Sequence, residues 1–244
     1  MRVMAVIPAR LASTRLPRKA LREIAGKPMV GWVYEAVAGA GVLERDQVVI
    51  ATDAQEILDL CNAHGWNARM TSTEHRSGTE RVQEIAESTP ADVYLNIQGD
   101  EPLTRPEHVE ALLQIMRDLR VQVGTLKTPC PEEDLNNPSA VKVVSDFTGN
   151  ALYFSRATIP FDRERSGPAY FKHLGFYAYR ADALRRFCRL HESRLERAER
   201  LEQLRFLENG IAIKVAETPF DTVGVDTESD LKRVEAVLAK VAPS

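Results

Sequence analysis

The sequence predicts an α/β fold with a mostly parallel central sheet and a smaller mixed or antiparallel part. Short apolar runs alternate with amphipathic stretches through the first half of the chain, as in βα units that feed a parallel sheet. After about residue 130 the alternation loosens and turn residues separate the apolar runs, which favours antiparallel or mixed pairing. We therefore expect one domain over residues 1–244, with approximately 130–210 as an elaboration of it.

Five short apolar runs are the expected strands of the parallel part. Each has the length of a buried strand and is followed by turn or helix signals. The runs are Val3–Ile7, Val48–Ala51, Ala68–Thr71, Val93–Ile97 and Val123–Leu126.

Helices are expected between these strands, because apolar residues recur there at steps of three and four. The pattern covers residues 29–37, 57–61, 82–86 and 109–116. Pro28 suits a first helical position, and Ser77-Gly78-Thr79-Glu80 has the form of a capping box.

The second half of the chain carries a different pattern. Val141–Val144 and Ala151–Phe154 flank a Thr148-Gly149-Asn150 turn, which predicts two paired strands. Beyond them we expect a strand over Phe171–Tyr179, a long charged helix over Leu195–Leu207, a strand over Ile211–Ala216 and a final helix that Thr227 and Asp230 cap. The Pro/Asn-rich stretch Cys130–Pro138 indicates an insertion rather than a hinge between domains.

Composition narrows the function classes. With 32 Lys plus Arg against 35 Asp plus Glu, the formal charge is −3, so no overall positive field attracts a nucleic acid and a small-molecule ligand is expected. The apolar run after the N-terminus ends at Pro8, far short of a signal peptide or a membrane span. Three widely spaced cysteines without a CxxC pattern indicate a reducing cytoplasm.

A basic loop follows the first expected strand. Pro8 to Lys19 contains Arg10, Arg15, Arg18 and Lys19, the hydroxyl residues Ser13 and Thr14, and no acid. Such a loop can be solvated, but ligands of open α/β sheets lie beyond the carboxyl ends of strands, which favours a triphosphate-binding role. Neither GxxxxGK[ST] nor GxGxxG occurs, so a Walker NTPase and a Rossmann dehydrogenase do not fit.

Two acids are candidate ligands of Mg²⁺. Asp100 follows the strand ending at Ile97, in Gln98-Gly99-Asp100-Glu101-Pro102, and Gly99 lets the backbone turn there. Magnesium takes one or two protein carboxylates besides substrate phosphates, and Asp226 is the candidate for the second. The alternative is that Asp226 only caps the helix that Thr227 opens.

A second candidate for nucleotide binding is the segment His75–Arg81. Its residues Arg76, Ser77 and Gly78 stand at an expected helix N-terminus, where free N–H groups favour anions or acceptor atoms. The segment could bind a base or ribose, or serve as a helix cap alone.

Polar residues in the second half could bind a carboxylated, hydroxylated substrate. His173 and Tyr177 share one face of an expected strand by their even spacing, and Arg156 supplies a cation. Glu202 and Gln203 adjoin apolar residues and could point inward, whereas the acids and arginines from Glu192 to Arg200 are expected on a solvated face. The alternative is a half-buried strand with satisfied polar groups. No serine, cysteine or histidine pattern indicates covalent catalysis or a zinc site.

Together these motifs resemble the 3-deoxy-manno-octulosonate cytidylyltransferases, also called CMP-Kdo synthetases, over nearly the whole chain. The joint order of the motifs is specific, although each alone is weak. They are IPAR-ASTRLP-K at 7–19, GKPM at 26–29, ATD at 51–53, SGTER at 77–81, QGDEP at 98–102, NP-AVKVV at 137–144, ALYFSRATIP at 151–160, HLG-Y-YR at 173–180, LEQLR at 201–205 and GVDT at 224–227.

The resemblance implies a three-layer nucleotide-diphospho-sugar transferase fold, a cytoplasmic homodimer, and sugar activation for the lipopolysaccharide inner core. It implies CTP and a 2-keto sugar acid as ligands and Mg²⁺ as cofactor, with part of residues 130–210 serving sugar binding and dimerisation. By matching motif, the resemblance implies these nucleotide ligands: Ala9, Arg10, Ser13, Arg15, Lys19, Arg76, Ser77, Gly78 and Gln98. The implied catalytic residues are Lys19, Arg10, Asp100 and Asp226, and the two acids are the implied metal ligands. The implied sugar ligands are Gln98, Arg156, His173, Tyr177, Glu202 and Gln203.

One departure from the family stands in the basic loop. Arg18 replaces the glycine and Ala20 the second proline of the usual LPGKPL, while Lys19 matches. The expected reaction is in-line attack of the sugar's anomeric hydroxyl on the α-phosphorus of CTP. Alternatives are a cytidylyltransferase for sialic acid, a methylerythritol phosphate or an 8-amino sugar acid, a metal-dependent glycosyltransferase, and a non-catalytic nucleotide sensor.

Overall fold

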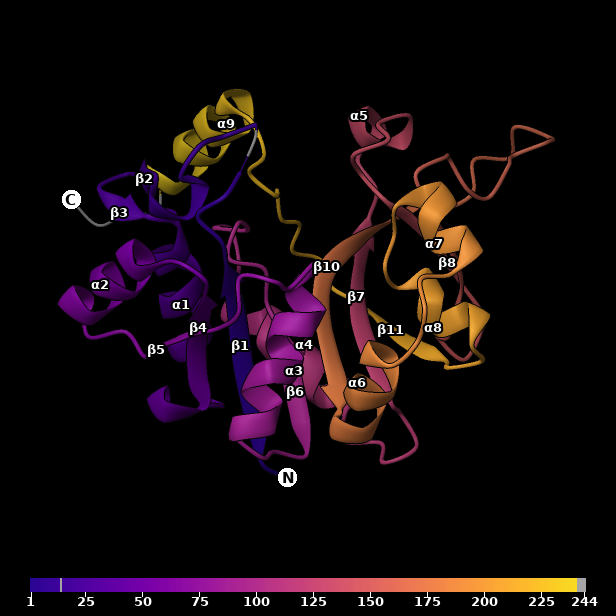
Figure 1. Ribbon diagram of the computed structural model, residues 1–244. Coiled ribbons are helices and arrows are strands. Elements are labelled where there is room, and N and C mark those ends of the chain that lie inside the picture. Colours follow the sequence, from indigo (N-terminus) through magenta and orange to yellow (C-terminus); the bar gives the residue numbers. More distant parts are fainter. Residues whose placement is uncertain (14, 241–244) are drawn as a thin grey trace. The chain divides into compact units, whose positions relative to one another are not determined.

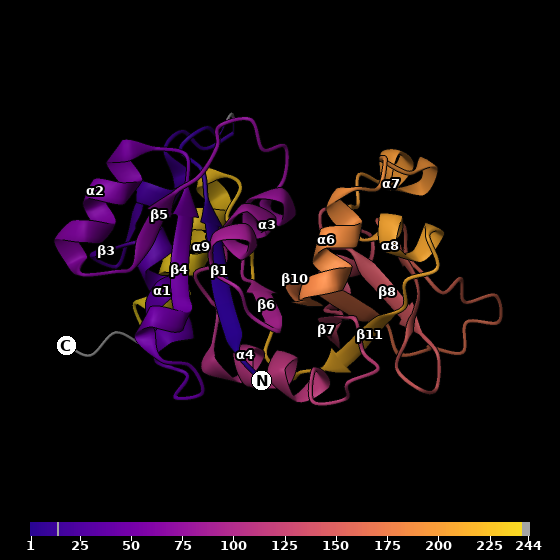
Figure 2. The ribbon, with the colours of Figure 1, turned by 60° about the horizontal axis from the view of Figure 1, so that its bottom comes forward.

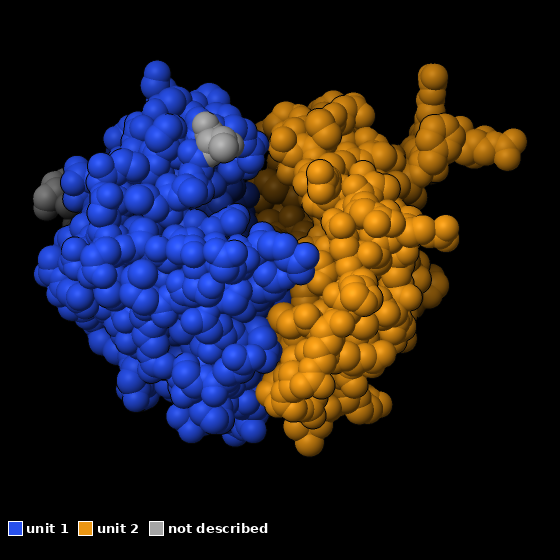
Figure 3. All heavy atoms as spheres, viewed as in Figure 1, with its two compact units in different colours: residues 1–110, 222–244 blue, residues 111–221 orange. Residues whose placement is uncertain are grey.

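The computed structural model describes residues 1–13 and 15–240 (Figure 1). The chain divides into two compact units, which Figure 3 colours separately. Unit 1 contains Met1–Glu110 and the described residues from Thr222 onward, and unit 2 contains Ala111–Asp221. The chain passes into unit 2 within helix α4, Pro106–Ile115, and returns after Asp221.

Unit 1 contains a parallel sheet of strand order β6-β1-β4-β5. Its middle strands are apolar on both faces, as expected where helices cover a parallel sheet. The strands are β1 (Val3–Ala9), β4 (Val48–Thr52), β5 (Ala68–Met70) and β6 (Val93–Asn96), and a separate hairpin consists of β2 (Glu23–Ile24) and β3 (Lys27–Pro28).

Helices follow strands of unit 1 in βα order, except the last helix, which follows the return of the chain from unit 2 (Figures 1 and 2). Each buries an apolar stripe, such as Ile57 and Cys61 on α2. The helices are α1 (Met29–Ala38), α2 (Gln55–His64), α3 (Gly78–Ser88) and α9 (Glu228–Leu238), with short 3₁₀ turns η1 (Lys19–Leu21) and η2 (Arg45–Gln47).

Unit 2 contains a mixed sheet. Strand β7 pairs parallel with β11 and antiparallel with β10, and β8 pairs antiparallel with both β10 and β9. The strands are β7 (Val123–Pro129), β8 (Lys142–Ser145), β9 (Ala151–Ser155), β10 (Phe171–Arg180) and β11 (Ile213–Glu217); the helices are α5 (Glu132–Leu135), α6 (Ala181–Cys188), α7 (Arg194–Glu199) and α8 (Leu204–Glu208).

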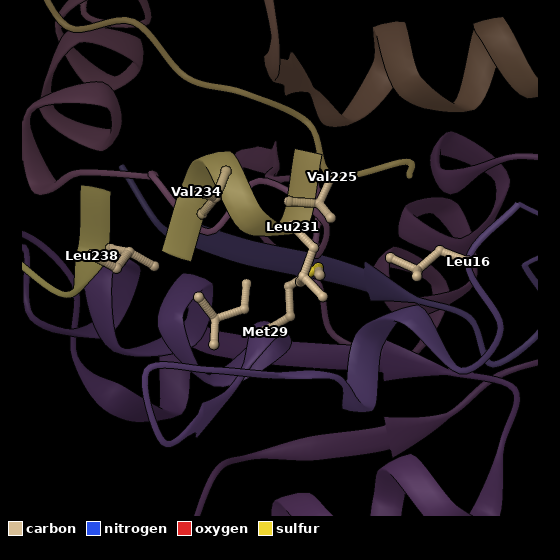
Figure 4. Close-up of a cluster of buried hydrophobic side chains, with 7 residues drawn as sticks. Leu16, Met29, Val225, Leu231, Val234 and Leu238 are labelled. Atoms are coloured by element: carbon tan, nitrogen blue, oxygen red, sulfur yellow. The ribbon is translucent and has the colours of Figure 1, made fainter. Parts of the chain in front are cut away.

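An apolar cluster in unit 1 joins segments far apart in the sequence (Figure 4). Leu16 of the basic loop and Val225, just before α9, are both fully buried in it. The other members are Ile24, Met29, Leu231, Val234 and Leu238. Because burial of each large aliphatic side chain contributes about 1.5–3 kcal/mol, the cluster fixes the loop and the start of α9 on one scaffold.

Unit 2 is held together by a continuous series of ring contacts. Phe154 meets His173 edge-on, and the series continues through Tyr177, Tyr179 and Phe206 to Phe187, with centroid separations from 4.3 to 5.7 Å. These separations are typical of favourable aromatic pairs. The series therefore packs β10 against α6 and α8.

The predicted α/β pattern is confirmed, including the hairpin turn between β8 and β9 and the Thr227–Asp230 capping box of α9. The long helix expected over Leu195–Leu207 is wrong. Arg200 adopts a left-handed conformation, φ 55°, which ends α7, and α8 starts only at Leu204. The charged sequence pattern continues from α7 into α8, so the pattern alone does not reveal that the helix is interrupted at Arg200.

Two helix starts also differ from the expectation. Pro28 lies in an extended conformation before α1 instead of at its first position. At α3, Ser77 caps the helix through Glu80 N–H, but the Glu80 carboxylate accepts the N–H of Arg76. Only half of the predicted capping box therefore forms. Within the described residues, every helix is too short or too polar to cross a membrane.

Candidate active site

A hollow lies in unit 1 where β1 ends and the loop after β6 begins. Carboxyl ends of adjacent parallel strands meet at one sheet edge, so both loops reach the same place. The residues that line the hollow are Pro8, Ala9, Arg10, Ala12, Ser13, Lys19, Ala20, Gly78, Arg81, Gln98, Gly99 and Asp100. Six of the predicted nucleotide ligands are among them: Ala9, Arg10, Ser13, Lys19, Gly78 and Gln98.

Gly99 brings the two loops together. A Cβ atom on it would lie 2.7 Å from the carbonyl oxygen of Pro8, which is closer than real contacts allow. The glycine therefore serves the close approach of two backbones, beyond the turn that the sequence suggested for it. This approach positions Gln98 and Asp100 beside the end of β1.

The basic loop closes through a left-handed residue. Arg18 has φ 56° and ψ 33°, and the N–H of Leu21 donates to its carbonyl over 2.9 Å to form η1. This is the position where the family usually has glycine, and a left-handed backbone explains that preference. Ala20 is buried in the same turn. The loop thus closes despite both departures and directs Lys19 into the hollow.

Lys19 bridges the two acids proposed as metal ligands. Its Nζ donates to Asp100 Oδ2 over 2.6 Å and to Asp226 Oδ1 over 2.9 Å. Arg15, which lies outside the hollow, pairs with the other oxygen of Asp226 at 2.9 Å. The structure therefore brings together four residues whose convergence sequence spacing could not show.

A backbone hydrogen bond holds the two acids close. The N–H of Val225 donates to the carbonyl of Asp100 over 2.9 Å, and burial of Val225 in the apolar cluster fixes this contact. Asp226 also donates its N–H to Asp230 Oδ2 over 3.1 Å, so it belongs to the helix start as well as to the site. The segment therefore both starts α9 and holds Asp226 against Lys19.

Charge and burial act in opposite directions on this cluster. Burial would lower the pKa of Lys19, but the charge and hydrogen bonds of Asp100 and then Asp226 outweigh it and raise the pKa above the ordinary lysine value. For Asp226, burial would raise the pKa, but Lys19 and then Arg15 hold it below the usual range. Lys19 and Asp226 are therefore both ionised at neutral pH.

The donor set fits a magnesium ion with few protein ligands. The Lys19 ammonium contacts the carboxylates of both Asp100 and Asp226. The two carboxylates are therefore close enough to bind a single cation. Across residues 1–13 and 15–240, no group of three or more acidic, histidine or cysteine side chains is arranged to hold a metal. A metal at Asp100 and Asp226 would therefore take its remaining ligands from phosphate and water, as magnesium commonly does.

The N-terminus of α3 forms another wall of the hollow. Gly78 lines it, and an added Cβ there would lie at ordinary contact distances from Pro8 and Gln98. Ser77 Oγ accepts the N–H of Glu80 over 3.3 Å, while the exposed Arg76 pairs with the Glu80 carboxylate at 2.8 Å. Gln98 is oriented by a 3.0 Å hydrogen bond from its amide nitrogen to Asn96 Oδ1.

Sequence reasoning included Arg81 in the segment His75–Arg81 but gave it no role of its own, although it lines the hollow and is fully buried. Its Nη2 donates to Asp53 Oδ2 over 2.8 Å and its Nη1 to Thr71 Oγ1, so it ties α3 to the ends of β4 and β5. A buried ion pair of this kind fixes geometry more than it adds stability. The ATD and SGTER motifs contain Asp53 and Arg81, but nothing in their spacing indicates the pairing.

The candidate sugar ligands lie in unit 2, apart from Gln98, which belongs to unit 1. Arg156 donates from Nε to the Glu199 carbonyl over 2.7 Å and from Nη1 to the Pro138 carbonyl over 2.8 Å. The Glu199 carboxylate in turn accepts the Arg156 N–H and the Ser155 hydroxyl. Arg156 is therefore positioned by backbone carbonyls next to the turn that ends α7.

His173 is a neutral side chain. Burial lowers its pKa to about 3, and its Nε2 lies 2.9 Å from Thr125 Oγ1. The Thr125 hydroxyl also lies 2.7 Å from the Phe176 carbonyl, to which it can only donate. We therefore assign the proton to Nε2 of His173, with Nδ1 as an acceptor. Tyr177 packs against His173 at a centroid separation of 5.4 Å.

Glu202 and Gln203 lie between α7 and α8, where Glu202 is half-buried and Gln203 buried. Arg205 holds this segment, because its Nε donates to Glu196 Oε2 over 2.8 Å and its guanidinium stacks on Phe187. The sequence assigned the neighbouring acids to a solvated face, but Glu196 is buried. The predicted nucleotide and metal ligands therefore belong to unit 1, and the predicted sugar ligands other than Gln98 belong to unit 2.

Comparison with known proteins gives consistent matches. The sequence pattern of a family described as Cytidylyltransferase matches residues 4–215. A relative from Koribacter versatilis (strain Ellin345), named 3-deoxy-manno-octulosonate cytidylyltransferase, is 67% identical over 238 residues, which cover 97% of this chain and 90% of the relative.

Two solved structures match the fold. One is described as CMP:2-keto-3-deoxy-manno-octonic acid synthetase complexed with CTP; it is 44% identical with a TM-score of 0.94, covering 99% of this chain and 100% of the other. The other, a putative glucose-1-phosphate thymidylyltransferase from Bacillus anthracis, is 13% identical with a TM-score of 0.69, covering 99% and 97%, and is alike in fold alone. The predicted fold is confirmed by these structures.

Proposed function

The chain belongs to the 3-deoxy-manno-octulosonate cytidylyltransferases, and on that premise we propose that it transfers CMP from CTP to the anomeric hydroxyl of 3-deoxy-manno-octulosonate, releases pyrophosphate and uses Mg²⁺. The observation that carries the proposal is the meeting of Lys19, Asp100 and Asp226 at a hollow that Arg10 and Ser13 also line. This arrangement combines cations for a triphosphate with carboxylates for a divalent ion.

The cations of the loop neutralise the triphosphate in this proposal. Arg10 and Lys19 line the hollow, and Arg15 stands at its acidic side through Asp226. Guanidinium groups bind phosphate oxygens in pairs, and an ammonium adds a mobile point charge. As pyrophosphate departs, negative charge grows on its oxygens, so these three side chains lower the barrier by stabilising the leaving group.

Asp100 and Asp226 hold the metal in this proposal. A magnesium ion bound there supplies a positive charge that lowers the pKa of the attacking hydroxyl and neutralises the phosphates. The two carboxylates fix where that charge stands, because Val225 and Gly99 pin their backbones.

The nucleoside is held by backbone and amide groups. We assign it to Ala9, Gly78 and Gln98, which line the hollow, together with Arg76 and Ser77 at the N-terminus of α3. The positive end of the helix dipole at that N-terminus suits acceptor atoms of a base or ribose. Arg81 positions this helix through Asp53 and is not itself assigned to the nucleotide.

By matching motif we assign the sugar acid to Gln98, Arg156, His173, Tyr177, Glu202 and Gln203. Arg156 has further N–H groups beyond those bonded to carbonyls, which can pair with a carboxylate. The neutral His173 offers an acceptor to a sugar hydroxyl. The set suits an acid with hydroxyls, and the 8-amino analogue and sialic acid remain alternative sugars.

A homodimer through unit 2 is part of the proposal. The large apolar side chains of Phe147 and Leu152 are exposed in the β8–β9 hairpin and that of Phe161 in the segment that follows it, and contiguous exposed apolar patches mark association surfaces. We expect Leu152→Lys to convert the dimer to a monomer in light-scattering measurements. A wild-type monomer, or an unchanged dimer in this variant, would contradict this surface. The family also implies that the protein acts in the cytoplasm, at a step in the synthesis of the lipopolysaccharide inner core.

A panel assay tests the function. Pyrophosphate release is measured with each of four nucleoside triphosphates and with 3-deoxy-manno-octulosonate, its 8-amino analogue and sialic acid, all with Mg²⁺. We expect release only with CTP and the fastest rate with 3-deoxy-manno-octulosonate. A faster rate with another sugar acid or nucleotide would replace the substrate assignment, and the absence of release from every pair would indicate a nucleotide sensor.

A further inference from the structure

Cationic nitrogen atoms bond three of the four carboxylate oxygens at the proposed metal site. Lys19 Nζ contacts Asp100 Oδ2 and Asp226 Oδ1, and Arg15 Nη2 contacts Asp226 Oδ2. The Lys19 side chain is only 14% exposed, whereas that of Arg15 is 65% exposed. Lys19 is therefore the cation that is held inside the site.

The backbone presets this position of Lys19. The left-handed turn at Arg18 and the burial of Ala20 direct the side chain inward, while the Val225 N–H fixes the acid side. Leu16 and Val225 share one apolar cluster, so both halves rest on the same support (Figure 4). The contact is thus built by the fold rather than by two flexible surface side chains.

A metal ion and this ammonium cannot hold the same oxygens. Magnesium requires carboxylate oxygens at about 2.0–2.1 Å, and two positive charges a few ångströms apart repel strongly in a part-buried site. The phosphates of a nucleotide offer Lys19 another partner in the adjoining hollow, which it also lines. The ammonium can therefore exchange carboxylates for phosphate.

We propose that Lys19 occupies, in the nucleotide-free protein, the place between Asp100 and Asp226 that the divalent cation takes, so that metal binding requires its displacement toward the triphosphate. This inference rests on the metal site of the proposed function. It makes Lys19 a positioning residue that delays metal binding until the nucleotide arrives, in addition to its role toward phosphate. Metal and nucleotide affinities are then coupled, and the coupling is reciprocal.

Metal binding without nucleotide tests the proposal. Free Mn²⁺ is titrated by electron paramagnetic resonance against the wild type, Lys19→Met and the control Lys27→Met, whose ammonium pairs with Glu35 of α1. We expect Lys19→Met to bind Mn²⁺ roughly tenfold more tightly than the wild type, because a competing charge is gone, and Lys27→Met to match the wild type. Equal or weaker binding by Lys19→Met would overturn the proposal.

Two further variants separate this outcome from failure of the metal site itself. If Asp100→Asn added to Lys19→Met abolishes the tight Mn²⁺ binding, the carboxylate pair is the site and the displacement stands. If tight binding survives in that double variant, the proposed metal ligands are wrong and the displacement falls with them. Lys19→Gln, which keeps a hydrogen-bonding side chain without charge, repeats the test in a less disruptive background. Its melting temperature should rise more with Mn²⁺ than that of the wild type, and an equal rise would count against the proposal.

Discussion

The N–H of Val225 donates a 2.9 Å hydrogen bond to the carbonyl of Asp100. This contact joins the segment before α9 to the loop after β6, and Asp226 comes next to Asp100 although 126 positions separate them in the sequence numbering. Val225 is held by burial in the apolar cluster that also contains Leu16. The packing of one valine therefore connects the fold to the chemistry of the site.

Truncation of the Val225 side chain should lower the stability of the protein. Val225→Ala leaves a small cavity in the cluster, and we expect it to lower the free energy of unfolding by about 2 kcal/mol. Val237→Ala removes the same atoms from the exposed face of α9 and should change stability by less than about 0.5 kcal/mol. Urea unfolding of both variants measures the difference. Equal losses would show that the cluster does not carry this segment.

Glycine at position 18 should relieve backbone strain. Arg18→Gly and Arg18→Ala both lose the ion pair with Glu56, but only glycine adopts the left-handed backbone without penalty. We expect the glycine variant to be more stable than the alanine variant by about 1 kcal/mol in thermal unfolding. An alanine variant of equal or greater stability would contradict the left-handed turn as the cause of the family's preference.

The buried pair of Arg81 and Asp53 should be sensitive to the loss of one partner. Asp53→Ala leaves a fully buried guanidinium without its counter-charge, and we expect a loss of about 3 kcal/mol in the free energy of unfolding. Asp118→Ala breaks the exposed pair with Arg120 and should leave stability unchanged. Because Arg81 positions α3, the Michaelis constant for CTP should also rise in Asp53→Ala. An unchanged constant would assign the pair to stability alone.

His173 should make the protein sensitive to mild acid. Its folded pKa of about 3 lies below the unfolded value near 6.5, so the unfolded chain takes up the proton first as the pH falls. The stabilising contribution is complete above about pH 6.5 and declines below it, by up to about 1.4 kcal/mol per pH unit. Urea unfolding at pH 7.0 and about 5.5 should show a smaller loss for His173→Gln than for the wild type. Parallel losses would mean that His173 is not buried neutral.

Local sequence patterns predicted the strands and the βα order because apolar periodicity directly reflects burial. They failed at Arg200, where a left-handed residue interrupts a charged pattern that could have continued as a helix. They also placed Glu196 in solvent, since its buried partner Arg205 lies in the next helix and periodicity cannot reveal such a pair.

Local sequence patterns likewise identified some residues of the candidate site and not others. The basic loop and Asp100 could be identified from position at strand ends, because parallel strands deliver their following loops to one edge. The pairing of Asp226 with Asp100 depends on the long-range contact of Val225, and the role of Arg81 depends on burial of a charge. Neither has a local signature, so the sequence offered Asp226 only as a candidate beside its alternative as a helix cap, and the ion pair of Arg81 was missed.

The catalytic rate of two amide variants tests the central claim most directly. Asp100→Asn and Asp226→Asn keep the shape of each side chain but remove the charge that would hold the metal. With CTP, 3-deoxy-manno-octulosonate and Mg²⁺, we expect kcat to fall by at least about a thousandfold in each, with a melting temperature close to that of the wild type. CMP-sugar synthesis at a near-normal rate in either folded variant would contradict the assignment of a metal-dependent nucleotidyl transfer to this pair of carboxylates.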